Sequence, residues 1–273
     1  MNRRSLLLGL AACACHSSKA PPLSFARAAL KLARDAGQAT AEQESSSINE
    51  LCQIAALAET ELKKARGAAS GQLLSRLLFE QLGFAREVTK TDLRFVLLPN
   101  VLQGRRGNCV GLGTLFLALS EALAWTANGV LMPGHFYVRL EEHGQSRNIE
   151  LLHRGEAMPT DWYSGRFPVP GGSAREYGRP LTATETLGVI AYDIGNERRR
   201  QLRFEDARQA YLHAAQLFPE LAEAHASLGA TLQVLGKLDE AAASYQIARN
   251  MNPHLPGVAQ NVAVLEDEQR ASE

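Results

Sequence analysis

The fold of this chain is most constrained by a pattern near its C-terminus that returns after 34 residues. Small residues, a tyrosine and a proline recur in register: Gly195, Ala207, Tyr211, Ala214 and Pro219 return as Gly229, Ala241, Tyr245, Ala248 and Pro253. Small residues let paired helices approach closely, tyrosines fill the space between them, and prolines end helices. Residues 184–273 are therefore expected to form an all-α unit of two helix pairs, with a capping helix at residues 257–268.

These two units resemble the tetratricopeptide repeat, which has the same period. Two repeats and a cap fall short of the usual minimum of about three repeats, so the unit is expected to need packing against the preceding domain for its stability. Asp193, Arg200 and Gln233 offer groups that can hold a protein partner, as any solvated helix face does.

The first residues have the layout of an export signal. Asn2-Arg3-Arg4 supplies positive charge, residues 5–12 are apolar or small, and Leu10-Ala11-Ala12-Cys13 follows. This last string resembles a bacterial lipobox, in which the cysteine is acylated. The resemblance implies that residues 1–23 are a signal and tether, and that Cys13 anchors the protein to a membrane of the bacterial cell envelope, facing the periplasm or the exterior. A loose twin-arginine signal and a cytoplasmic protein with an apolar start are the alternatives.

The charge balance and the cysteine spacing exclude some classes of partner and site. The chain balances 29 basic against 29 acidic residues and has no basic stripe outside residues 198–200, so nucleic acid is not an expected partner. Cys15, Cys52 and Cys109 show no Cys-x-x-Cys spacing, so neither a zinc knuckle nor a disulfide framework is expected. Cys52 lies in an apolar run and is expected to be a small buried hydrophobe.

Helical spacing of apolar residues dominates the chain before Cys109. We expect helices at residues 24–36, 48–65, 73–82 and 92–102, with a polar separator at 39–47 and breaks around Gly83 and at Pro99. A further helix follows Asn108, a residue type that caps helices. Cys109 then falls in the first turn of that helix, where backbone N–H groups and the helix dipole favour a thiolate.

From Val130 the period of the apolar residues changes to two, and Gly144 marks a turn, so a β-hairpin is expected. An even number of loop residues would put His135 and Glu150 on one face as direct or diagonal neighbours, and an odd number would separate them.

Residues 158–179 are rich in proline and glycine and are expected to be irregular. Four aromatic residues of this segment either line a groove or pin the segment to the core: Trp162, Tyr163, Phe167 and Tyr177.

Cys109, His135 and Glu150 follow one another in the order thiol, imidazole, carboxylate, the set that thiol-dependent acyl transfer requires. Their surroundings, Leu102-Gln103-Gly104-Arg105-Arg106-Gly107-Asn108-Cys109 and Pro133-Gly134-His135-Phe136-Tyr137-Val138-Arg139, resemble the transglutaminase-like superfamily, in particular a bacterial branch in which such a domain precedes tetratricopeptide repeats. The likeness covers roughly residues 45–270. It implies an α+β fold, with a helix-rich papain-like domain and a small antiparallel sheet over residues 24–183, followed by the all-α repeat unit.

The resemblance also implies an enzyme without cofactor or metal, a hydrolase or acyltransferase acting on amide bonds in a peptide, protein or cell-wall crosslink. Cys109 would be the nucleophile, His135 the base, and Glu150 the acid that orients the imidazole. Glu150 stands where the family usually has aspartate, and Asn148, on the same face, is the substitute. Gln103, six residues before Cys109, has the spacing of a papain-type oxyanion glutamine.

Each residue also has a structural interpretation. Taken alone, Cys109 is equally a buried core thiol, His135 a hydrogen-bonded structural residue and Glu150 a solvated strand position. His143 and His153 flank the hairpin, but a zinc site there would lack short ligand spacing. The alternative function is a catalytically inactive scaffold whose repeats bind a protein partner.

Overall fold

The structure is a computed structural model that describes residues 23–65, 69–87, 92–172 and 175–272. The chain divides into two compact units, one of Met1–Val130 with His135–Trp162 and one of Leu131–Gly134 with Tyr163–Glu273. The predicted domain boundary after residue 183 lies further along the chain than this division. Cys13 and the predicted signal lie outside the described residues. Within the described ranges, no helix is both long and apolar enough to cross a bilayer.

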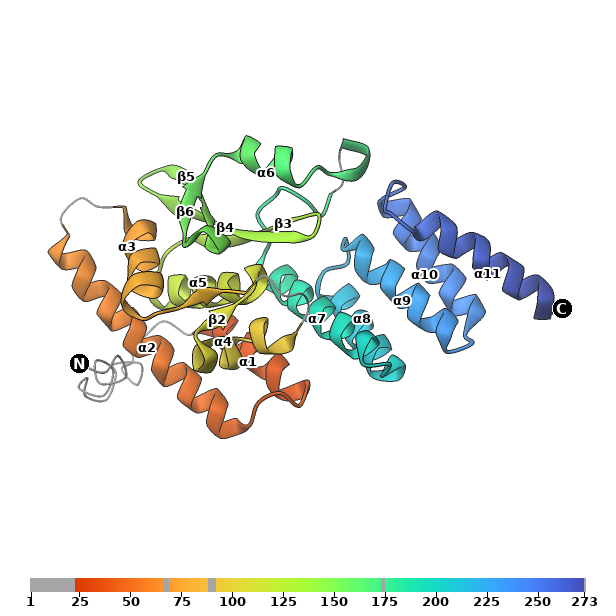
Figure 1. Ribbon diagram of the computed structural model, residues 1–273, viewed down its shortest axis with the longest axis horizontal. Helices are drawn as coiled ribbons and strands as arrows, with labels where there is room; N and C mark the ends of the chain where they lie inside the picture. The colour runs from red at the N-terminus through yellow and green to blue at the C-terminus, as the bar shows by residue number, and fades with distance from the viewer. Residues whose placement is uncertain (1–22, 66–68, 88–91, 173–174, 273) are drawn as a thin grey trace. The chain divides into compact units, whose positions relative to one another are not determined.

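The first unit is built around helix α5 (Cys109–Ala122), which is buried along most of its length. Helices α1 (Ser24–Asp35), α2 (Ala41–Lys64) and α4 (Leu98–Gly104) contact α5, and Figure 1 shows α5 between these helices and the sheet. A helix that is apolar on all sides belongs in such a position. The predicted helix after Asn108 is therefore confirmed and forms the core of the unit.

Two helices begin differently from the prediction. Helix α2 starts inside the expected polar separator, because Thr40 Oγ1 accepts a hydrogen bond from Gln43 N (3.2 Å) while Gln43 Oε1 accepts one from Thr40 N (2.8 Å). This capping box makes the polar residues the first turns of the helix. The helix predicted over residues 92–102 is broken, but at residues 96–97, so that Pro99 lies in the first turn of α4, where proline fits because no N–H donor is needed.

Short elements connect these helices. Helix α3 (Ser70–Arg76) continues as the π-helical turn η3 (Leu77–Gln81), and the 3-10 turn η4 (Leu93–Phe95) precedes α4. Strands β1 (Ala85–Arg86) and β2 (Arg106–Gly107) pair in parallel directly before Asn108.

The sheet of four strands has the order β3 (Ala127–Met132), β4 (His135–Glu142), β5 (Gln145–Glu150) and β6 (Glu156–Met158). The predicted hairpin is formed by β4 and β5, with Glu142 opposite Gln145. Two residues connect the strands, His143 (φ 52°) and Gly144 (φ 76°). Positive φ at both positions matches a tight turn of the hairpin type. The loop is even-numbered, which is the condition that places His135 and Glu150 on one face.

The segment predicted to be irregular begins at the last residue of strand β6 and contains a short helix, α6 (Thr160–Arg166). Asn148 Nδ2 donates to Met158 O (3.3 Å) and Thr160 Oγ1 (3.2 Å), and so fixes the entry to α6. Tyr163 and Tyr177 are buried, which favours the interpretation that these rings pin the segment.

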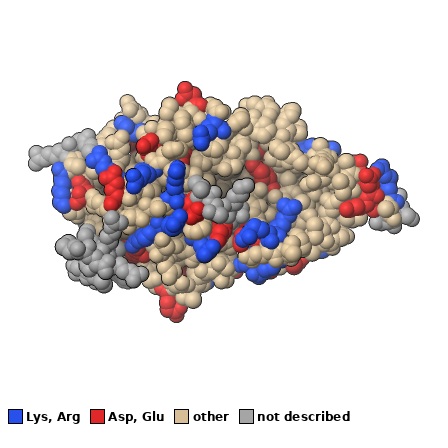
Figure 2. All heavy atoms as spheres, in the orientation of Figure 1, with Lys and Arg blue, Asp and Glu red and all other residues tan. Residues whose placement is uncertain are grey.

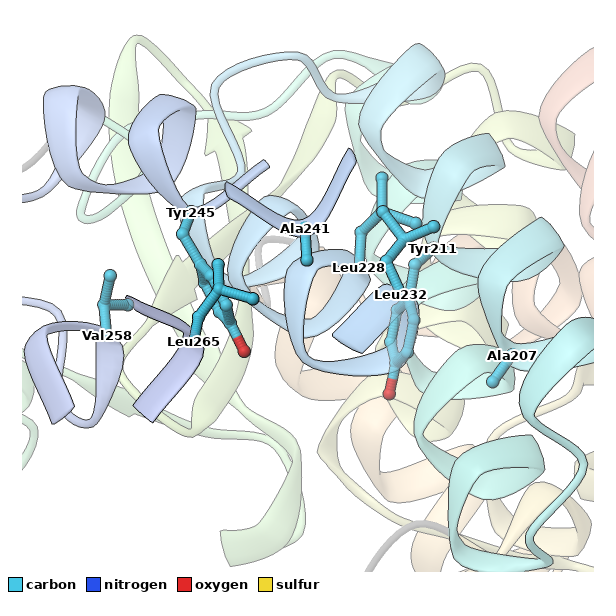
Figure 3. Packing of buried hydrophobic residues seen from close by; sticks show 8 residues of the cluster. All are labelled: Ala207, Tyr211, Leu228, Leu232, Ala241, Tyr245, Val258 and Leu265. Atoms are coloured by element: carbon cyan, nitrogen blue, oxygen red, sulfur yellow. The ribbon is translucent and has the colours of Figure 1, made fainter. Parts of the chain in front are cut away.

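The second unit is helical after residue 182. It contains α7 (Ala183–Arg200), α8 (Phe204–Leu217), α9 (Ala222–Val234), α10 (Leu238–Met251) and α11 (Val258–Ser272). The bounds of α8 and α10 differ by 34 residues, as the sequence period does. Figure 3 shows the shared core of this unit, in which buried alanine and leucine side chains surround Tyr211 and Tyr245.

Close helix contacts explain the recurring glycines. A Cβ atom added to Gly195 would lie 2.5 Å from the Tyr211 ring, and one added to Gly229 would lie 2.8 Å from the Tyr245 ring. Only glycine lets each tyrosine lie flat against the preceding helix, so the same packing contact occurs twice.

Candidate functional site

Cys109 is the first residue of α5, forms no disulfide and has a half-buried side chain. Asn108 caps the helix, because its Oδ1 accepts a hydrogen bond from Gly111 N (2.9 Å). The thiol therefore lies at the positive end of a 14-residue helix dipole. Such a position favours the thiolate over the thiol.

The backbone before Cys109 is held from two sides. Asn108 N donates to Phe95 O (2.8 Å), and Glu87 N donates to Gly107 O (2.8 Å). Gly111 packs directly on the Phe95 carbonyl, where a Cβ atom would collide. The start of α5 is thus fixed in place, as a nucleophile requires.

His135 and Glu150 lie in direct contact. His135 Nε2 and Glu150 Oε2 are 2.7 Å apart, and the two side chains are 5% and 0% exposed. The register of β4 and β5 pairs Arg139 with Asn148, so His135 and Glu150 lie on one face as diagonal neighbours. A buried carboxylate bonded to one ring nitrogen fixes both the tautomer and the orientation of the imidazole.

The second oxygen of Glu150 is also used. Glu150 Oε1 accepts a hydrogen bond from Leu152 N (2.9 Å) at the start of the 3-10 turn η5 (Leu151–His153). Both oxygens of this carboxylate therefore have partners, which is the condition under which a buried acid is tolerated.

Helix α5 packs against the strand that begins at His135. A Cβ atom added to Gly113 would lie 2.5 Å from the Phe136 ring, so the helix and the strand approach closely at this point. Cys109 lies four residues before Gly113 and therefore on the same helix face. Helix α5 and strand β4 therefore meet at Gly113 and Phe136, four residues after Cys109 and one residue after His135.

Asn148, the predicted substitute for Glu150, is directed to other groups. Its Oδ1 accepts a hydrogen bond from Arg139 Nε (2.9 Å), and Arg139 Nη2 donates to Tyr137 Oη (3.0 Å). Burial raises the pKa of Tyr137, Arg139 lowers it, and the charge of Glu150 adds a smaller upward contribution. Tyr137 and Arg139 are neighbours of the site that sequence reasoning did not single out, although they share the strand parity of His135.

The other predicted residues are dispersed. Gln103 is exposed on the last turn of α4, and the described residues give its side chain no hydrogen bond, so its oxyanion role stays a prediction. His143 is exposed in the hairpin turn, and the His153 ring packs edge-on against Trp162 with 5.5 Å between centroids. Across the described ranges, no group of three or more potential metal ligands of the His, Cys, Asp and Glu types is found.

Cys52 is buried as predicted, with 2% of its surface exposed, but it is disulfide-bonded. The sequence showed no Cys-x-x-Cys spacing that would indicate this bond. Cys52 therefore serves as an unreactive reference for Cys109.

Two of the three repeat residues that could hold a partner have internal partners. Arg200 pairs with Glu197 (2.7 Å), and Gln233 Nε2 donates to Glu268 (2.9 Å). Asp193 is half-buried on α7, and burial raises its pKa to about 7 against an opposing hydrogen bond from Asn196.

Comparison with known protein families assigns most of the first unit to a broad superfamily. Residues 45–166 match the model of the transglutaminase-like superfamily, so this segment is a transglutaminase-like domain. A crystal structure of menin, described as revealing the binding site for the Mixed Lineage Leukemia (MLL) protein, is 12% identical with a TM-score of 0.39. That match covers 85% of this chain and 66% of the menin chain. No curated protein matches the sequence.

Proposed function

We propose that this protein is a cysteine-dependent hydrolase or acyltransferase of the cell envelope that acts on amide bonds through Cys109, His135 and Glu150. The proposal is carried by the buried 2.7 Å contact between His135 Nε2 and Glu150 Oε2, on a strand that packs against the helix starting at Cys109. Support also comes from Cys109 itself, a half-buried cysteine outside any disulfide at the N-terminus of α5. The transglutaminase-like domain supports a cysteine-dependent family.

The chemistry proceeds through a thioester. The Cys109 sulfur attacks the amide carbonyl carbon, and its proton passes through His135 to the leaving amine as the C–N bond breaks. Because Nε2 faces Glu150, this proton moves through Nδ1. Water or a second amine then attacks the thioester carbonyl and releases the thiol. The Cys109 backbone N–H at the helix N-terminus, together with Gln103, would stabilise the oxyanion.

The proposal is tested with a generic acyl donor. Full-length protein is mixed with p-nitrophenyl acetate, and the release of nitrophenolate is followed while the acetylated peptides are identified by mass spectrometry. We expect a burst of about one nitrophenolate per protein, with acetyl on Cys109, that is lost in Cys109→Ala and slowed more than tenfold in His135→Ala. Absence of a burst, or equal rates in wild type and His135→Ala, would refute the enzyme assignment.

The 34-residue helix pairs favour a second function, in which tetratricopeptide-type repeats hold a protein partner. On this view the transglutaminase-like domain is an inactive support. A partner recovered equally by wild type and Cys109→Ala, in a protein that shows no burst, would favour the scaffold. The two functions are compatible, because repeats can deliver a substrate to the thiol.

The envelope location rests on the Leu10-Ala11-Ala12-Cys13 string. Cys13→Ala should abolish incorporation of labelled palmitate in bacterial cells and move the protein out of the membrane fraction. Unchanged labelling would refute the anchor without affecting the catalytic proposal.

A further inference from the structure

Arg86 occupies an unusual position beside the proposed nucleophile. Strand β1 pairs in parallel with β2 so that Arg86 lies opposite Gly107, two residues before Cys109. Neighbouring strands are about 4.8 Å apart, and two residues of chain span at most about 7 Å. The Cα atoms of Arg86 and Cys109 are therefore within about 12 Å of each other.

The guanidinium of Arg86 is directed towards the acid end of the site. Arg86 Nη1 donates to Leu152 O (3.2 Å), and Leu152 N donates to Glu150 Oε1 (2.9 Å). Glu150 in turn holds His135. Leu152 thus bonds to both Arg86 and Glu150, the carboxylate that orients the imidazole.

Arg86 also differs from Arg105 and Arg106 in whether a carboxylate pairs with its charge. Arg105 pairs with Glu50, and Arg106 pairs with Glu87. Figure 2 shows basic and acidic side chains interspersed on the face drawn, as such local pairing produces. Arg86 is exposed, and among the described residues its side chain has no carboxylate partner and only the one hydrogen bond to a carbonyl.

We infer that Arg86 binds a carboxylate of the substrate and so selects acyl donors with a negative charge next to the scissile amide, such as acidic peptides. This inference rests on the proposed cysteine chemistry. Arg86 has several uncommitted N–H donors, one backbone contact at Leu152 O, and a Cα within about 12 Å of that of Cys109, and a guanidinium so placed can recognise a carboxylate. The acidic groups nearest to it in the chain and the site are already matched, Glu87 by Arg106 and Glu150 by His135.

The test compares two alkylating probes of similar size, anionic iodoacetate and neutral iodoacetamide. Rate constants for Cys109 are measured on the full chain by mass spectrometry of its peptide. Arg86→Gln should lower the ratio of the iodoacetate rate to the iodoacetamide rate by about three- to tenfold, as expected for removing one charge at this distance. Arg86→Lys keeps the charge and should retain most of the ratio.

Arg27 offers a matched control. It is an exposed arginine on α1 of the same unit, next to Ala26, whose N–H donates to Glu121. Glu121 lies twelve residues after Cys109 on α5, which corresponds to about 18 Å. Arg27→Gln should leave the ratio unchanged, and equal ratios in Arg27→Gln and Arg86→Gln would overturn the inference.

Two outcomes separate this inference from the proposed function. If iodoacetamide labelling of Cys109 depends on His135, but the ratio of the iodoacetate rate to the iodoacetamide rate is the same in wild type and Arg86→Gln, only the Arg86 assignment fails. If Cys109 reacts with neither probe, the proposed function itself fails. Should Arg86→Gln not fold, salt serves instead: raising NaCl from about 0.05 M to 0.5 M should lower the wild-type ratio, and a constant ratio would contradict the inference.

Discussion

Replacing Glu150 by glutamine changes one buried oxygen into an NH2 group and leaves the side-chain volume nearly unchanged. Glu150 is 0% exposed and makes two hydrogen bonds, to His135 Nε2 and to Leu152 N. A glutamine can accept from Leu152 N only with its carbonyl oxygen, so its NH2 group then faces His135 Nε2. The imidazole must carry its proton on Nδ1 in that arrangement, which is the wrong tautomer for taking a thiol proton.

The magnitude follows from the bonds that are lost. A hydrogen bond to a charged group contributes about 1.5 to 3 kcal/mol, and about 1.4 kcal/mol corresponds to a tenfold change in rate. The glutamine variant should therefore react about 10- to 150-fold more slowly at Cys109. The fold should remain intact, because the Leu152 contact is kept.

The assay is the pseudo-first-order rate of Cys109 carbamidomethylation by iodoacetamide at pH 7, with Cys52 as the unreactive reference. Asn148→Ala is the matched control, since Asn148 is a buried polar residue on the same face of β5 whose bonds go to Arg139, Met158 and Thr160. It should lower the melting temperature but change the rate less than threefold.

Two results would refute this reasoning. A Glu150→Gln protein that reacts within threefold of wild type would show that the carboxylate does not control the imidazole. An Asn148→Ala protein that loses as much reactivity as Glu150→Gln would show that the strand face as a whole, and not one acid, determines the rate.

Three further predictions concern packing and pH. Gly113→Ala places a Cβ atom 2.5 Å from the Phe136 ring, so it should cost about 1 to 3 kcal/mol by denaturant unfolding and slow Cys109 labelling; unchanged values for both would contradict the close approach. Gly195→Ala should destabilise the repeat unit by a similar amount, whereas Gly165→Ala, with no atom within 4 Å of the new Cβ, should be neutral or stabilising. Because burial raises the pKa of Asp193 to about 7, above the unfolded value of about 3.9, the folded state binds more protons between these values. The free energy of unfolding should therefore fall on the order of 2 kcal/mol as pH rises from about 4 to 7, less than the full shift implies because Asp193 as a residue is only half-buried. Asp193→Asn should flatten this dependence, and a pH profile identical to wild type would refute the assignment.

Local patterns predicted much of this molecule because the interactions behind them are local. Asn108 caps α5 through a bond to the third residue of the helix, and the two-residue turn at His143 and Gly144 sets the hairpin register. Predicted helix boundaries differed from the structure where a single residue allowed a helix to start at an unexpected position. Thr40 caps α2, so that the expected separator forms the first turns of this helix, and the break expected at Pro99 falls two residues earlier because proline fits the first turn of α4.

The order of thiol, imidazole and carboxylate, the helix start at Cys109 and the 34-residue period were all fixed by residue type and spacing, since these depend on contacts within a few turns or one hairpin. Tertiary structure alone decided which residue meets His135, because Glu150 and Asn148 share a strand face, yet Glu150 bonds to His135 and Asn148 to Arg139. It also decided that Arg86 lies opposite Gly107, two residues before Cys109, since the parallel pairing of β1 and β2 joins segments about 20 residues apart, a contact that no local periodicity encodes.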